Sequence, residues 1–303
     1  MITAEGLGKR YGDKTAVDGV SFTVRPGMVT GFLGPNGAGK STTMRMIVGL
    51  DRPSSGRVTV AGQEYRKLRA PLTEVGVLLD AKAVHTGRTA RNHLRAMAAT
   101  HGIPSSRVDE VIELAGIQSV ARKRAGKFSL GMGQRLGIAA ALLGDPHTLI
   151  LDEPVNGLDP EGVRWVRQFV RHAASEGRTV LLSSHLMSEM AQTADHVIVL
   201  GRGKVLADAP LDELVRAWTV NTVRVRTPRA ADLAALVAGP SVEIVNTGPE
   251  TLDVVGLPAS RIGDLAADRG IPLHELTPTT GSLEDAYLAL TGDSVEYKTK
   301  EIA

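Results

Sequence analysis

The sequence predicts an α/β fold followed by a small α+β unit, and three observations carry this prediction. A short apolar strand, a glycine-rich loop and a helix follow one another over residues 29–50. Further on, apolar strands alternate with helical stretches, which favours parallel strands joined by crossovers. Near the end, the order becomes strand–helix–strand–strand–helix–strand, which is typical of a split βαβ unit.

The first sixty residues are rich in strand signals. Residues 16–17 and 20–24 are predicted strands on either side of a turn, 29–33 is a buried strand, and 57–60 returns as a strand. A helix is predicted from Lys40 to about Leu50. Short mixed strands beside one strand–loop–helix unit indicate a core with an antiparallel β subdomain.

A helical stretch interrupts the core between about residues 85 and 145. Apolar residues recur there at helical spacing, as at Leu94, Met97 and Ala98. Core strands then resume, and a hairpin turn at Arg202-Gly203 leads into a last core strand. The predicted strands are 148–151, 179–183, 196–200 and 204–207.

The order of predicted strands and helices changes near Trp218. A last helix begins at Ser282, with Asp285 as its capping partner. We expect a large domain of residues 1–218, a small accessory domain of 219–292 and a flexible tail of 293–303. The accessory domain has predicted strands at 222–226, 242–245, 252–255 and 272–276, and predicted helices at 232–237 and 260–267.

Composition limits the classes of protein. Hydrophobic residues make up 43% of the 303 residues and charged residues 22%, which is ordinary for a folded soluble protein. The formal net charge of +2 argues against a dedicated nucleic-acid binder. The absence of cysteine excludes disulfides and thiolate metal sites. The N-terminus lacks the pattern of a secretory signal, and no apolar run approaches the length of a membrane span.

The glycine-rich loop fits the pattern G-x-x-x-x-G-K-[ST]. It follows a buried strand and opens a helix, which is the context that confirms a P-loop. Glycines let backbone N–H groups converge on phosphate oxygens, and the helix N-terminus adds partial positive charge. We expect Lys40 to reach the β- and γ-phosphates of ATP and the Ser41 hydroxyl to bind Mg²⁺. The predicted loop residues are Gly34, Pro35, Asn36, Gly37, Ala38, Gly39, Lys40, Ser41 and Thr42.

A second motif lies about 110 residues further on, where an apolar strand ends in Asp152 and Glu153. Two carboxylates after a strand are a weak signal alone, but a P-loop upstream makes the signal strong. Asp152 is predicted to hold magnesium, directly or through water, and Glu153 to polarise the attacking water.

The chain resembles the ATP-binding subunits of ABC transporters over roughly residues 1–215. The resemblance begins with the segment Ser129-Leu130-Gly131-Met132-Gly133-Gln134-Arg135, which is similar to the family's signature motif. Tyr11 is similar to the aromatic residue that stacks on adenine, and the segment 75–80 to the one that leads into the Q-loop. Gly157-Leu158-Asp159 resembles the D-loop, and His185 the switch histidine.

Two positions depart from the family pattern. Leu130 and Met132 replace a glycine and the glutamine of the usual signature, while Ser129 and Gly131 are kept. Asp80 stands where the family has the Q-loop glutamine. These variants, and the last helix of the chain, resemble exporters of the drug and peptide-antibiotic resistance type. Asp80 is therefore a third candidate ligand for magnesium, through a water molecule.

The resemblance implies a mechanism and partners. Two subunits would face each other head to tail and enclose two ATP molecules, each bound by one P-loop and by Ser129, Gly131 and Met132 of the opposite subunit. Hydrolysis, with Glu153 and His185 as catalytic residues, would release this homodimer and drive separate membrane-spanning permease subunits. The protein would then lie at the cytoplasmic face of the cell membrane, with no nucleic acid as partner.

Three alternatives keep the ATPase but change its task. An ABC ATPase that acts on ribosomes would carry two fused ATPase units and a basic linker, and a DNA-repair ATPase would carry a long coiled-coil insertion; neither pattern is present in this sequence. An importer ATPase is disfavoured by Asp80 and by the last helix. The neighbouring reading frames would separate these alternatives, since a six-helix membrane protein would support transport.

Overall fold

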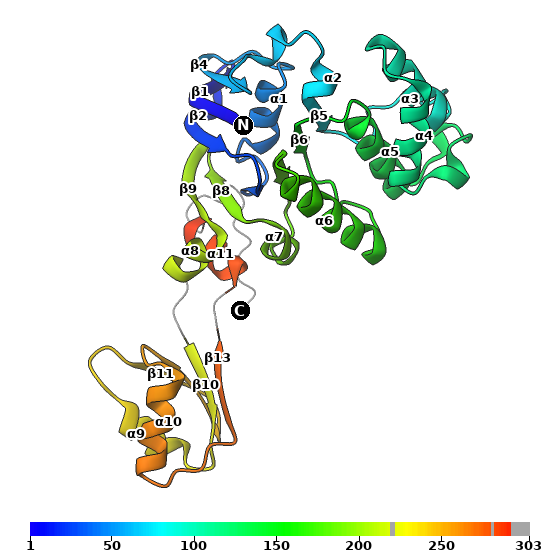
Figure 1. The fold of residues 1–303 in the computed structure, drawn as a ribbon. Coiled ribbons are helices and arrows are strands. Elements are labelled where there is room, and N and C mark those ends of the chain that lie inside the picture. The colour runs from blue at the N-terminus through cyan, green and yellow to red at the C-terminus, as the bar shows by residue number, and fades with distance from the viewer. Residues whose placement is uncertain (219–221, 280–281, 292–303) are drawn as a thin grey trace. The chain divides into compact units, whose positions relative to one another are not determined.

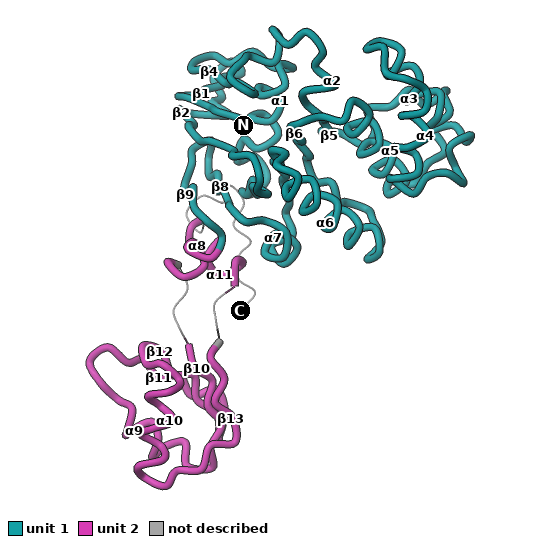
Figure 2. The backbone as a smooth tube through the Cα atoms, in the orientation of Figure 1, with its two compact units in different colours: residues 1–211, 291–303 teal, residues 212–290 magenta. Residues whose placement is uncertain are grey.

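The computed structural model describes residues 1–218, 222–279 and 282–291 (Figure 1). Two compact units contain Met1–Leu211 and Asp212–Leu290 (Figure 2), and each is described by itself. Across these described ranges, no helix has both the length and the apolar character that a membrane span requires. The predicted tail of residues 293–303 lies outside the described residues.

A six-stranded sheet forms the centre of the first unit, in the order β5-β6-β7-β3-β8-β9. The strands from β5 to β8 are parallel, and β9 returns antiparallel after the predicted turn at Arg202-Gly203. Every residue of β3, β6 and β7 is buried, as expected for strands covered on both faces. The strands are β3 (Val29–Leu33), β5 (Val75–Leu78), β6 (Thr148–Leu151), β7 (Thr179–Ser183), β8 (His196–Gly201) and β9 (Lys204–Pro210).

Helices follow these strands, and their starts lie at the carboxyl ends of the strands. α1 (Lys40–Ile47) follows β3, α6 (Pro160–Ser175) follows β6, and α7 (Met187–Thr193) follows β7. The predicted crossovers and parallel pairing are thus confirmed. α1 ends at Ile47, earlier than predicted, because Gly49 adopts a left-handed φ of +67° and the Leu50 N–H turns back to the Arg45 carbonyl.

A three-stranded antiparallel sheet, in the order β2-β1-β4, lies in the same unit. Its strands are β1 (Ile2–Tyr11), β2 (Lys14–Val24) and β4 (Ser55–Val60). The turn predicted between residues 17 and 20 is wrong, because β2 runs through it. Gly19 adopts a left-handed φ of +63° and the register with β1 shifts between Val17 and Val20, so the glycine makes a bulge rather than a turn.

The helical insertion consists mainly of α3 (Ala90–Thr100), α4 (Ser105–Leu114) and α5 (Leu130–Leu142). α5 packs closely on β5 at Gly137, where an added Cβ would lie 2.5 Å from the Leu78 side chain. A side chain at this position would force Leu78 to shift, so glycine favours the close approach. The remaining short helical segments of the unit are η1 (Tyr65–Lys67), α2 (Pro71–Glu74), η2 (Gln118–Val120) and η3 (Ala125–Lys127).

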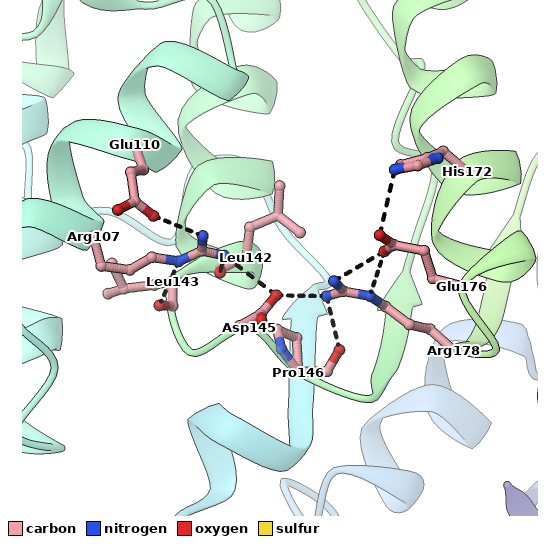
Figure 3. A network of polar contacts seen from close by, with 9 residues as sticks. All are labelled: Arg107, Glu110, Leu142, Leu143, Asp145, Pro146, His172, Glu176 and Arg178. Atoms are coloured by element: carbon pink, nitrogen blue, oxygen red, sulfur yellow. Dashed lines mark hydrogen bonds and ion pairs between the residues drawn. The ribbon is translucent and has the colours of Figure 1, made fainter.

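A polar network joins the end of the insertion to the edge of the core (Figure 3). Arg107 of α4 donates to the Leu142 carbonyl at 2.9 Å, at the C-terminal end of α5. It also bonds to Asp145, which in turn accepts from Arg178 just before β7 at 2.8 Å. This network therefore ties the C-terminal end of α5 to the core.

The second unit is a four-stranded antiparallel sheet in the order β11-β12-β10-β13, with two packed helices. The predicted strand–helix–strand–strand–helix–strand order is confirmed. The elements of this part are α8 (Leu211–Trp218), β10 (Thr222–Arg226), α9 (Ala230–Val237), β11 (Glu243–Gly248), β12 (Thr251–Val255), α10 (Ala259–Asp268), β13 (Glu275–Thr279) and α11 (Leu283–Thr291).

The start of the last strand is a correction. The predicted strand 272–276 is wrong, since β13 begins at Glu275. The buried Ile271 donates its N–H to the Ala266 carbonyl and so still completes the end of α10. The capping of the final helix is confirmed: Ser282 N–H donates to Asp285 Oδ2 at 2.9 Å, and Asp285 N–H to Ser282 Oγ at 3.1 Å.

Candidate nucleotide site

A cavity of about 370 Å³ opens where β3 meets α1. The predicted loop residues 35–42 line it, and three more predicted residues join them from other elements: Tyr11 from β1 and Asp152 and Glu153 from the end of β6. Lys14 and Ala16 of β2, which were not predicted, complete the wall. The antiparallel sheet and the central sheet thus both contribute residues to one cavity.

The loop is built around glycine conformations. Gly39, which caps α1, has a φ of +103°, and an added Cβ would lie 2.7 Å from the Ala16 carbonyl oxygen. Lys40 is buried and its Nζ donates to the Gly34 carbonyl at 2.5 Å and to the Pro35 carbonyl at 3.2 Å. Burial lowers the pKa of Lys40, and the nearby Glu153 and Asp152 carboxylates oppose this shift.

A group of oxygen atoms gathers at the mouth of the loop. Ser41 Oγ donates to Asp152 Oδ2 at 2.8 Å, and Ser183 Oγ bonds to the other carboxylate oxygen of Asp152. Hydroxyl and carboxylate oxygens suit Mg²⁺, which keeps several of its own waters. Within the described ranges, no group of three or more His, Cys, Asp or Glu residues forms a metal cage.

Glu153 is held in an unusual conformation, with a left-handed φ of +50°. Its backbone N–H donates to Ser183 Oγ at 3.0 Å, and its carbonyl accepts from Gln134 Nε2 at 2.8 Å. Its carboxylate oxygen Oε2 lies 2.6 Å from His185 Nδ1 and accepts the His185 N–H at 3.3 Å. The structure thus brings the two predicted catalytic residues into contact.

Tyr11 projects from the edge of the cavity with 48% of its surface exposed. Its hydroxyl donates to Asp51 Oδ2 at 2.9 Å, and Arg45 of α1 donates to the same oxygen at 2.8 Å. The Lys9 ammonium lies 4.9 Å from the ring centroid. These contacts orient the ring, and the hydrogen bond from Arg45 holds the pKa of Asp51 below its usual value.

Seven predicted residues do not line this cavity: Gly34, Asp80, Ser129, Gly131, Met132, Asp159 and His185. Ser129 caps α5 and accepts from Met132 N–H at 3.3 Å, while Gly131 approaches the Gly157 carbonyl so closely that an added Cβ would lie 2.7 Å away. Asp159 caps α6 by accepting from Gly162 N–H at 2.9 Å. Asp80 is exposed after β5 and accepts from Lys82 N–H at 2.7 Å.

Sequence reasoning assigned no role to Ser183 or Gln134. Ser183 carried a usable signal, because it ends β7, the neighbour of β6, and parallel strands bring their carboxyl ends to one edge. Gln134 carried none, since nothing in its spacing shows that α5 lies against the end of β6.

The central parallel sheet, the glycine loop and the two acidic residues after β6 define a P-loop nucleoside triphosphatase. The family model described as "ABC transporter" matches residues 17–156. A "Domain of unknown function (DUF8746)" matches residues 221–284, and an "AAA domain, putative AbiEii toxin, Type IV TA system" matches 122–191.

Individual proteins extend this similarity. The chain is 43% identical to the bacitracin transport ATP-binding protein BcrA of Bacillus licheniformis, over 71% of each chain. It is 34% identical to the daunorubicin resistance ATP-binding protein DrrA3 of Streptomyces coeruleorubidus, over 100% of this chain and 98% of the other. A solved ATP-binding subunit of an ABC transporter is 26% identical with a TM-score of 0.66, covering 72% of this chain and 92% of that one.

The chain therefore belongs to the ATP-binding subunits of ABC transporters. Members of this family bind ATP and hydrolyse it, and the predicted fold class and ATPase activity are confirmed.

Proposed function

We propose that this chain powers the export of a drug, antibiotic or related small molecule through a separate permease. The observation that carries the proposal is the cavity lined by the buried Lys40, by the Ser41–Asp152 pair and by Glu153, whose carboxylate contacts His185. Its relatives' names include bacitracin transport and daunorubicin resistance, which supports an exporter of that class.

In this proposal, residues 34–42 bind the phosphates of ATP. Lys40 exchanges its bonds to the Gly34 and Pro35 carbonyls for phosphate oxygens, which restores the positive charge that burial disfavours. The N-terminus of α1 adds partial positive charge at the same place. Tyr11 supplies an aromatic face for the adenine ring, a contact of the kind that stabilises bases by stacking.

Glu153 is proposed to accept a proton from the attacking water, and His185 to orient the carboxylate through the contact at Nδ1. Ser41 and Asp152 would hold Mg²⁺, with Asp80 as a more distant candidate through water. Bound magnesium would neutralise developing charge on the phosphates. The two oxygens 2.8 Å apart on Ser41 and Asp152 fit such an ion.

The residues at the start of α5, which do not line the cavity, are assigned a role in a homodimer. Ser129, Gly131 and Met132 stand at the start of α5, the end of the helix that carries partial positive charge. We propose that they contact the γ-phosphate of ATP held by a second copy, head to tail, with Asp159 at the same interface. Membrane-spanning permease subunits would read the closing and opening of this dimer at the cytoplasmic face of the cell membrane.

The division into an ATPase domain of 1–218, with an insertion at about 85–145, and an accessory domain of 219–292 remains part of this proposal. The accessory domain has its own hydrophobic core around Val225, Leu233 and Leu252. We assign it support of the dimer or regulation rather than chemistry.

The experiment is Glu153→Gln in the full-length chain with ATP and magnesium. Loss of the carboxylate removes the proton acceptor while the phosphate contacts stay, so turnover should fall by about 10²-fold or more with ATP affinity retained. Unhydrolysed ATP should then trap a dimer in sedimentation runs. A monomer that still hydrolyses ATP at the wild-type rate would refute the assignment.

A further inference from the structure

The backbone of Glu153 is held at both of its polar groups by side chains from other elements. Ser183 of β7 accepts its N–H, and Gln134 of α5 donates to its carbonyl at 2.8 Å. Glu153 is also one of few non-glycine residues here with a left-handed φ, at +50°. Such a conformation persists only where surrounding contacts fix it.

Gln134 is a buried polar residue with 4% of its surface exposed. Its Nε2 bonds to the Glu153 carbonyl, while its Oε1 is buried with no hydrogen-bond partner among the described residues. A buried amide that makes only part of its hydrogen bonds is unfavourable for stability, which indicates that the remaining contact has another use. That contact is with the proposed catalytic residue.

The location of Gln134 explains how its contact links α5 to Glu153. α5 begins at the Ser129 cap and passes Gly133, where an added Cβ would lie 3.4 Å from the Ala81 carbonyl. Gln134 is the point at which this helix touches the residue after Asp152. A shift of α5 therefore moves the donor that fixes the Glu153 carbonyl.

We infer that Gln134 is a positioning residue that holds Glu153 in its left-handed conformation. The direction in which the Glu153 carboxylate points then depends on the position of α5. The inference rests on the proposed role of Glu153. It adds that the start of α5, assigned above to the ATP of a second copy, also acts on the carboxylate of its own subunit.

Gln134→Met tests this, because methionine has a similar length and no donor. We expect kcat to fall about tenfold, with the Kd for ATP changed by less than about twofold. Gln134→Asn, which stays polar but is too short to reach the carbonyl, should act in the same direction. Gln118→Met is the matched control, since Gln118 also donates to a backbone carbonyl in the insertion but is exposed.

A double-mutant cycle with Glu153→Gln, followed by single-turnover phosphate release, separates positioning from general damage. If Gln134 acts through Glu153, Gln134→Met should cause little further loss in the Glu153→Gln background. Unchanged kcat in both Gln134 variants, or an equal loss in both backgrounds, would overturn the inference. The proposed function fails separately, if Glu153→Gln alone leaves turnover intact.

Discussion

The two units of the chain differ in backbone conformation and in the burial of their charged side chains. In the first, the site depends on left-handed residues at Gly39 and Glu153 and on the buried cation of Lys40. In the second, every non-glycine residue that the structure describes has a negative φ. Its Arg224 and Asp253 side chains, on adjacent strands, are joined by two hydrogen bonds. Of the left-handed non-glycine residues, Glu153 is the one that lines the cavity, and surrounding contacts hold it there, whereas the second unit follows ordinary strand and helix preferences.

The largest effect should come from the buried cation. Lys40→Ala removes a charged hydrogen-bond donor to phosphate worth about 1.5–3 kcal/mol in total, so ATP affinity should fall about 10- to 100-fold. Titration with a fluorescent ATP analogue measures this. Lys204→Ala, which removes an exposed lysine paired with Asp18, should leave affinity unchanged. Equal affinities for wild type and Lys40→Ala would contradict the contrast between the units.

A smaller effect is expected at the half-exposed ring. Tyr11→Ala should weaken ATP binding about fivefold to tenfold, near the lower end of the range for base stacking. Inorganic tripolyphosphate, which has no base, should bind wild type and variant within about twofold. Tyr11→Phe keeps the ring and loses only the bond to Asp51, so it should bind ATP more tightly than Tyr11→Ala. Parallel losses for both ligands would mean that Tyr11 supports the loop rather than the base.

The smallest effect belongs to the second unit. Arg224→Ala breaks a two-bond pair with Asp253 whose arginine is exposed, and exposed ion pairs contribute little, so the free energy of unfolding should fall only slightly. ATPase kcat should not change. Denaturant unfolding and phosphate release measure the two quantities. A clear loss of kcat would show that the second unit acts on the site.

The pH dependence of that pair sharpens the same test. The hydrogen bond from Arg224 lowers the pKa of Asp253 in the folded chain. The pair therefore stabilises the fold above the ordinary pKa of aspartate, and its contribution is lost as the pH falls through the lowered pKa. The difference between wild type and Arg224→Ala should be constant near neutral pH and should vanish in acid. A difference that persists in acid would point to packing instead.

The features predicted correctly from sequence are those fixed by short stretches of chain. The glycine loop before α1, the strand β6 that ends just before Asp152 and the cap at Ser282 all depend on backbone geometry within a few residues. The errors arose where local signals were ambiguous. Gly19 fits a turn as well as a bulge, and the segment 272–274, which directly precedes β13, instead belongs to the stretch after the end of α10.

By itself, the sequence determined the class of site, because short runs of consecutive residues decide where the glycines of the loop lie, where the helix begins and where the strand ends. Only the tertiary structure decided how the catalytic region is held. Ser183, Gln134 and Asp51 act through contacts with Glu153, Asp152 and Tyr11 that join separate elements. The spacing of residues in the sequence does not predict such contacts. They form because α5 packs on β5 and because the order of strands in the sheet brings these side chains together.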